Sequence, residues 1–173
     1  MKIALCNPEV KLKYSHSRKG MYPPLGLLSL ATCLKKTHND YIDVSIIDGD
    51  TQTIKHEMFR GADIVGFHAN TFNYENCLDL AREAKGYGAK IIFGGPHASI
   101  LWKNIMAKRS YVDFIVIQEG EKALSLLVEQ LLNKGKNCFD DIPNLAYRKS
   151  DGAPVKSSSI HINTPEEMIT PSR

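Results

Sequence analysis

Residues 89–99 read AKIIFGGPHAS. In this stretch an apolar run ends on Gly94-Gly95-Pro96-His97, and a second apolar-periodic segment follows. The pattern is typical of a parallel strand that is buried on both faces and leads through a bare-backbone loop into a helix. Glycines allow a ligand to approach the main chain closely, and ligands of open α/β sheets bind beyond the carboxyl ends of the strands. The stretch therefore predicts a binding loop at a sheet edge.

Strand and helix patterns alternate over most of the chain. Strands are predicted at residues 2–6, 44–47, 63–67, 89–93 and 114–117, and helices at residues 25–36, 54–59, 74–85, 98–108 and 121–133. The helix at residues 54–59 has the weakest pattern. This alternation predicts an α/β fold with a doubly wound, flavodoxin-like or Rossmann-like sheet of five parallel strands in the order 2-1-3-4-5.

The last part of the chain has a different pattern. Residues 145–148 and 155–156 flank Asp151-Gly152 and predict a small β-hairpin. From Ser157 onward the chain is polar, and prolines interrupt residues 163–173, which predicts a linker. We therefore expect a binding domain at residues 1–140 and a hairpin with a linker at residues 141–173, in a chain that is a segment of something longer.

Composition narrows the function classes. The 173 residues are 43% hydrophobic and 24% charged, which is typical of one soluble globular domain. A net charge of +3 with scattered Lys and Arg gives no indication of nucleic-acid binding. The N-terminus is too short for a signal peptide and no apolar run has the length of a membrane span. We expect a cytoplasmic protein without a membrane partner.

The cysteines indicate neither a metal site nor disulfides. The chain has four, and no two of them form a CxxC or CxxxC pair: Cys6, Cys33, Cys77 and Cys138. A zinc knuckle or an iron–sulfur loop needs such closely spaced ligands. We expect these side chains to be small core residues in a reducing compartment.

Four predicted loops leave the sheet at the same edge. Polar and small residues gather in them: Asn7-Pro8, Asn70-Thr71, Gly94-Gly95-Pro96-His97 and Glu119-Gly120-Glu121. Backbone N–H groups at the following helix starts would offer donors to an anionic or amide-bearing ligand. The chain has no GxGxxG after its first strand and no GxxxxGK[ST] motif, which disfavours a dinucleotide or a nucleoside triphosphate. The edge suits a large ligand with many polar substituents.

Each of these loops is also compatible with a purely structural role. Gly94-Gly95 alone could form a tight turn, and His97 could cap the next helix or face solvent. Asn70-Thr71 fits a helix start, as do the carboxylates of Glu119-Gly120-Glu121 beside a helix dipole. For His68, after a buried strand, a satisfied loop histidine is favoured over a metal ligand.

Three motifs occur in the order and at the spacing of a known family. They are residues 23–31 (PPLGLLSLA), residues 94–99 (GGPHAS) and residues 118–124 (QEGEKAL). Together they resemble the N-terminal cobalamin (B12)-binding domain of B12-dependent radical SAM enzymes. Residues 142–152 also resemble the end of those domains, before their linker to the catalytic barrel. The resemblance covers nearly the whole chain.

The resemblance implies a corrinoid against the carboxyl edge of the sheet, with its nucleotide tail reaching toward the core. The implied cofactor-binding residues are Asn7, Pro24, Leu25, Asn70, Thr71, Gly94, Gly95, Pro96, His97, Glu119 and Gly120. The glycine loop and Asn70-Thr71 would flank the tail, whereas the turns at Pro24-Leu25 and Glu119-Gly120 would line the corrin. No residue is assigned as a catalytic group or as a metal ligand.

The chain departs from related patterns at two places. Cobalamin mutases carry DxHxxG after the first strand, and here that loop reads Asn7-Pro8-Glu9-Val10. A base-off cobalamin without a histidine ligand from that motif is therefore implied, with His16 a weak candidate in the same loop. Gln118 stands where the family usually has glycine, which predicts a narrower corrin pocket.

The leading hypothesis is a cobalamin-binding module of a B12-dependent radical SAM enzyme of the methyltransferase type. The chain has no CxxxCxxC motif, so SAM and a [4Fe–4S] cluster would belong to a C-terminal half or to a partner protein. This chain alone would then not be catalytic. The alternative is a degenerate domain that keeps the fold, binds no corrinoid and serves as a scaffold or interaction module. A receiver domain is rejected, because Asn7 and His68 stand where it needs acidic residues.

Overall fold

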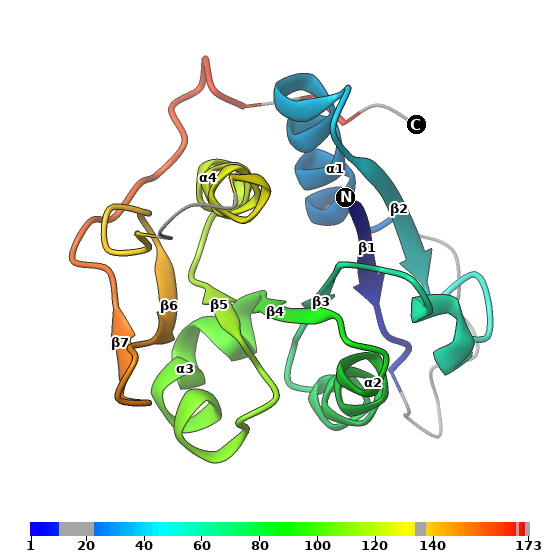
Figure 1. Cartoon of the computed structure of the whole chain (residues 1–173). Coiled ribbons are helices and arrows are strands. Elements are labelled where there is room, and N and C mark those ends of the chain that lie inside the picture. Colours follow the sequence, from blue (N-terminus) through cyan, green and yellow to red (C-terminus); the bar gives the residue numbers. More distant parts are fainter. Residues whose placement is uncertain (11–22, 134–137, 169, 172–173) are drawn as a thin grey trace.

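One mixed β-sheet organises the computed structural model, which describes residues 1–10, 23–133, 138–168 and 170–171. Within these residues the strand order is β2-β1-β3-β4-β5-β6-β7 (Figure 1). The strands are β1 (Lys2–Asn7), β2 (Asp43–Asp48), β3 (Ile64–His68), β4 (Lys90–Gly94), β5 (Phe114–Val116), β6 (Leu145–Arg148) and β7 (Pro154–Lys156). β1 to β5 pair in parallel, whereas β6 and β7 are antiparallel. The predicted α/β class is confirmed.

The predicted sheet of five strands is wrong in extent, because β6 and β7 extend it. β6 pairs with β5 through Ile115 opposite Ala146, and β7 then pairs with β6. Leu145 and Ala146 are fully buried. Pairing with β5 satisfies the backbone groups of an edge that would otherwise stay open, and it buries these apolar side chains. The sequence pattern predicts a hairpin, but it does not indicate that the hairpin pairs with β5, which lies far away in the sequence.

Two helices cover each face of the sheet. The α-helices are α1 (Leu25–His38), α2 (Tyr74–Gly86), α3 (Pro96–Lys108) and α4 (Glu121–Leu132). α1 and α4 lie on one face, and α2 and α3 lie on the other (Figure 1). Ile91 and Phe93 pack toward α2 and α3, whereas Ile92 packs toward α1 and α4. Successive side chains of a strand point to opposite faces of the sheet, so an apolar run such as β4 is buried on both faces.

Two predicted helices differ from the structure in detail. α3 begins at Pro96, not at Ala98, because proline fits the first helical turn, where its missing N–H is not needed. His97 therefore lies inside the helix. The weak pattern at residues 54–59 corresponds to a four-residue 3₁₀-helix, η2 (His56–Phe59), whose Phe59 is fully buried.

Arg148 ties the added edge of the sheet to α3. Its guanidinium donates hydrogen bonds to the carbonyl oxygens of Met106, Arg109 and Val112. These groups lie at and just beyond the C-terminal end of α3, where carbonyls lack helical partners. A side chain of β6 thus caps a helix from a distant part of the sequence.

Arg148→Met should lower the free energy of unfolding by about 2–3 kcal/mol, because carbonyls that accept from a charged donor lose their partner. Urea denaturation monitored by circular dichroism measures this loss. Lys149→Met changes the exposed neighbouring residue and should alter stability by less than about 0.5 kcal/mol. Equal effects of the two substitutions would contradict the capping role.

Candidate functional site

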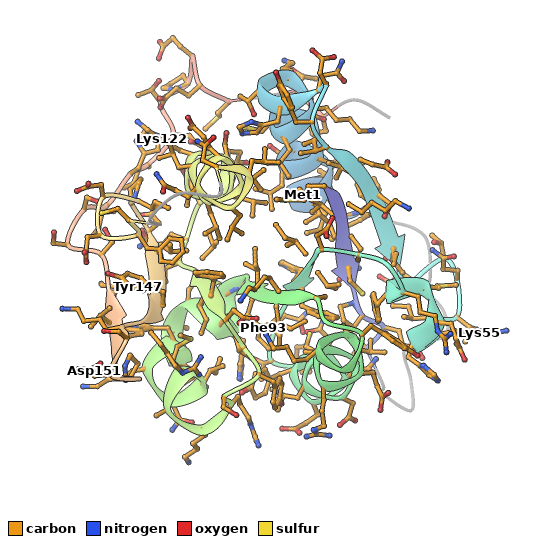
Figure 2. All side chains as sticks on the ribbon, in the orientation of Figure 1. Met1, Lys55, Phe93, Lys122, Tyr147 and Asp151 are labelled. Atoms are coloured by element: carbon orange, nitrogen blue, oxygen red, sulfur yellow. The ribbon has the colours of Figure 1, made fainter. Side chains whose placement is uncertain are left out.

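A cavity of about 900 Å³ lies between the sheet and helices α1 and α4, at the carboxyl ends of the strands. Figure 2 shows side chains of the sheet and of these helices pointing into the space between them. The buried lining is apolar and comprises Leu5, Leu27, Phe67, Ile92, Val116 and Leu124. The polar lining comes from the strand ends, the helix starts and the C-terminal segment, and comprises Ser29, His68, Ser99, Gln118, Glu119, Glu121 and Asn163. An apolar interior with a polar mouth suits a ligand that has both kinds of surface.

The structure brings only part of the predicted site to this cavity. The predicted residues that line it are Leu25, Gly94, Gly95, Pro96, Glu119 and Gly120. The predicted residues that do not are Asn7, Pro24, Asn70, Thr71 and His97. Their part in cofactor binding stays a prediction.

Residues outside the cavity lining have local structural contacts. Asn7 donates from Nδ2 to Asp48 Oδ1 at 2.9 Å. The Asn70 side chain accepts from the backbone N–H groups of Phe72 and Asn73, which organises the turn before α2. The His97 ring lies over the ring of Tyr74 with 4.2 Å between centroids. The Asn70 contacts correspond to the structural alternative of a helix start, whereas the His97 ring neither caps α3 nor faces solvent but packs on Tyr74.

The two glycines after β4 have different surroundings. Gly95 has φ of +91°, and a Cβ there would lie 2.7 Å from Ala69 O and 2.9 Å from His68 Cδ2. Only glycine fits this backbone contact. At Gly94 a Cβ would meet nothing closer than Val116 O at 3.8 Å. Gly95 is therefore required for the close packing of this loop against Ala69, whereas Gly94 leaves space that a side chain could occupy.

A third glycine opens the cavity from the helix side. Gly26 lies in the first turn of α1 and lines the cavity. A Cβ built on it would meet no heavy atom of the described residues within 4 Å. The neighbouring Leu25 is 61% exposed. Gly26 therefore leaves space in the cavity wall, and the apolar side chain of Leu25 lies beside it at the mouth.

The loop after β5 is held by carboxylate hydrogen bonds. Ser29 Oγ donates to Glu121 Oε1 at 2.8 Å, and Asn163 Nδ2 donates to Glu121 Oε2 at 2.9 Å. The backbone N–H of Asn163 donates to the Glu119 carboxylate. Both carboxylates thus connect the loop to other elements, which adds a structural role to their position at the cavity.

Asn163 belongs to the C-terminal segment, residues 157–168 and 170–171. Figure 1 shows this segment passing α4 and reaching toward α1. Asn144, buried and with φ of +58°, donates from Nδ2 to Glu119 O at 3.1 Å and to His161 O at 2.6 Å. Met168 and Pro171 line the cavity. The described part of the predicted linker therefore begins against the cavity mouth, which no local pattern indicated.

His68 lines the cavity, although it is not among the predicted cofactor-binding residues. Its side chain makes no hydrogen bond to any residue that the structure describes, and the interpretation as a loop histidine in preference to a metal ligand stays a prediction. Burial lowers the pKa of His68 below its usual value, which keeps the ring neutral at pH 7. Its position opposite Gly94 in the β3–β4 pairing was the signal that could have identified it.

The described residues contain no cluster of three or more His, Cys, Asp or Glu side chains that could hold a metal ion. His16, the weak cobalt-ligand candidate, lies outside the described residues. Within residues 1–10, 23–133, 138–168 and 170–171, no helix is long and apolar enough to cross a membrane.

Comparison with known proteins identifies the family. Residues 13–128 match the family model described as the B12 binding domain. The match covers more than half of the chain, and the chain belongs to this family.

Curated relatives are longer proteins. An uncharacterized methyltransferase of Pyrococcus horikoshii is 29% identical over 158 residues, which cover 87% of this chain and 33% of the relative. The anaerobic magnesium-protoporphyrin IX monomethyl ester cyclase of Rubrivivax gelatinosus is 27% identical over 165 residues, which cover 88% of this chain and 29% of the cyclase. The chain thus spans about a third of the length of these relatives.

A solved structure has a similar fold. It is the cobalamin-dependent S-adenosylmethionine radical enzyme OxsB with aqua-cobalamin and S-adenosylmethionine bound. The TM-score is 0.78 at 20% sequence identity, over 99% of this chain and 24% of that enzyme. At this identity the likeness establishes the fold.

Asn144→Ala should lower the free energy of unfolding by about 2–4 kcal/mol, because three partly buried hydrogen bonds disappear and alanine tolerates positive φ poorly. It should also speed proteolysis within residues 157–171. Urea denaturation measures the first effect, and limited digestion with a glutamate-specific protease, which can cut after Glu166 and Glu167, measures the second. Asn104→Ala, at an exposed position of α3, is the matched control. A comparable loss of stability in that variant would contradict the role of the Asn144 hydrogen bonds.

His68 should make stability depend on pH below neutrality. Its folded-state pKa lies below the unfolded value, so the unfolded chain binds more protons and stability falls as the pH drops below about 6.5. His68→Gln should flatten this part of the profile, by at most about 1.4 kcal/mol per pH unit. Urea denaturation at pH 7, 6 and 5 tests this, with the exposed His56→Gln as control. Parallel profiles for His68→Gln and the wild type would contradict it.

Proposed function

We propose that this chain is a cobalamin-binding module and that the cavity between the sheet and helices α1 and α4 holds the cofactor. The observation that supports this most is the shape and lining of the cavity in a member of the B12 binding domain family. Its 900 Å³, its apolar interior and its polar mouth match a large ligand with an apolar nucleotide base and many amide substituents.

Glycines in the cavity lining leave room for a large cofactor. Gly26 and Gly94 line the cavity, and a Cβ on either would meet no described atom closer than 3.8 Å. The tail of the cofactor would lie along Gly94 and the apolar side chains of Leu5 and Ile92, which would exclude water from it. The corrin would lie at the mouth, near Leu25 and the loop after β5. This arrangement keeps the glycine loop beside the tail and Leu25 beside the corrin, and it leaves out Asn70 and Thr71, which do not line the cavity.

The proposed cofactor is base-off cobalamin. With its nucleotide tail inside the protein, the benzimidazole base would be withdrawn from the cobalt. The loop Asn7-Pro8-Glu9-Val10 carries no histidine to replace it. When bound, cobalamin supplies cobalt chemistry that carries an alkyl group, and the residues of this chain would bind, orient and shield it.

The reaction is proposed to be completed by a radical SAM domain, in the same protein or in a partner. The relatives include a methyltransferase and a cyclase of which this chain matches about a third, and the similar structure is a radical SAM enzyme of which it matches 24%. The chain contains no CxxxCxxC motif for a [4Fe–4S] cluster. We favour methyl transfer as the reaction and assign no catalytic residue to this chain.

A degenerate, corrinoid-free scaffold is the second candidate. Two observations favour it: the side chain of Gln118 stands at the cavity, and Met168 and Pro171 of the C-terminal segment line it as well. These residues reduce the space at the mouth. Direct measurement of cofactor retention separates the two candidates.

Gly26→Phe should reduce cobalamin retention at least about tenfold, because the ring would fill cavity space, whereas replacing a helical glycine should not destabilise the fold. Protein incubated with hydroxocobalamin is desalted, and its visible spectrum is recorded. The wild type should retain a base-off spectrum. Gly86→Phe is the matched control, since Gly86 ends α2, lies outside the cavity and also has no neighbour within 4 Å of a Cβ.

A colourless wild-type protein would overturn the binding function. Full retention by Gly26→Phe would instead overturn the placement in this cavity. Cobinamide, which lacks the nucleotide tail, should bind more weakly than hydroxocobalamin if the tail occupies the apolar interior. Substitution of Gly95 is less informative, because its Cβ would collide with the backbone of Ala69 whatever the ligand does.

A further inference from the structure

Gln118 occupies a backbone conformation that is unfavourable for its residue type. Its φ is +62°, and among the described residues the only other non-glycine residue with positive φ is Asn144. L-residues with a Cβ are disfavoured in this left-handed region, where glycine is the usual occupant. The chain itself uses glycine for positive φ at Gly61, Gly88, Gly95 and Gly152.

The two exceptions differ in what their side chains do. Asn144 is buried, and its amide holds Glu119 and His161 through three hydrogen bonds, which explains its conformation. The Gln118 carboxamide is exposed and makes no hydrogen bond within the described residues. Packing and hydrogen bonding within the fold therefore give no reason for glutamine at this position.

The position of Gln118 is nevertheless well defined. It follows β5 directly, and its backbone N–H donates to Ser99 Oγ at 2.9 Å in the first turn of α3. The residue lines the cavity together with Gly94 and Gly120. An unpaired carboxamide, with two donors and one acceptor, is thus held at the cavity mouth by a strained but anchored backbone.

We propose that Gln118 is a binding contact of the cofactor site, whose carboxamide hydrogen bonds to the amide side chains at the edge of the bound corrin. The inference rests on the proposed function. Amide-to-amide pairing is the complementary chemistry for this side chain, because both partners offer a donor and an acceptor. The conformational strain at residue 118 is then retained because glycine, which would relieve it, cannot make the contact.

The test compares two properties of Gln118→Gly. Its midpoint of thermal unfolding should rise by about 2–4 °C, because glycine removes the cost of positive φ. Its Kd for hydroxocobalamin, from visible-absorbance titration, should increase by about 3- to 10-fold, as expected for one lost hydrogen bond. Gln118→Asn, which keeps an amide and tolerates positive φ, should bind with an intermediate Kd. Gln52→Gly, at an exposed turn outside the cavity, is the control for both measurements.

The outcomes separate this inference from the proposed function. A more stable Gln118→Gly with weaker binding supports the inference. A Gln118→Gly protein that binds as tightly as the wild type overturns it while leaving the cobalamin function in place, and so does a less stable Gln118→Gly, which would remove the strain argument. A wild-type protein that binds no hydroxocobalamin overturns both.

Discussion

The site depends on a close backbone contact between the carboxyl ends of β3 and β4. Ala69 donates its N–H to Gly94 O at 2.8 Å, and His97 donates its N–H to Ala69 O at 3.2 Å. Gly95 lies between these bonds, where any side chain would collide with Ala69. The chain can therefore turn from strand into helix without placing a side chain over the strand ends, and this part of the cavity is walled by bare backbone.

The opposite wall depends on polar side chains that serve the fold and the site together. Glu119 and Glu121 accept hydrogen bonds from Ser29 and Asn163, and Asn144 joins the same loop to the C-terminal segment. Polar residues in a loop motif are thus not automatically available to a ligand. The buried hydrogen bonds fix the loop, and the groups without internal partners are left to face the cavity.

The interior of the cavity is lined by apolar side chains. Protein interiors are close-packed, and unfilled apolar space costs stability. Here Gly26 on α1 places no side chain in the space beside it, and Gly66 on β3 leaves room for the Leu5 side chain, which lines the cavity. A ligand with an apolar group would recover the lost contacts, which agrees with the family to which the chain belongs.

The local patterns of the sequence determined the α/β class, the strand at residues 89–93 and its glycine loop, because burial on two faces and helix periodicity are properties of neighbouring residues. Three family motifs also indicated the class of ligand. Only the tertiary structure decided that β6 and β7 extend the sheet, that Arg148 caps α3, and that the C-terminal segment lies against the cavity. It also separated Gly94 and Leu25, which line the cavity, from Asn7 and His97, which do not. These outcomes depend on contacts between residues far apart in the chain, and the spacing of residue types along a sequence carries no information about which distant side chains will meet.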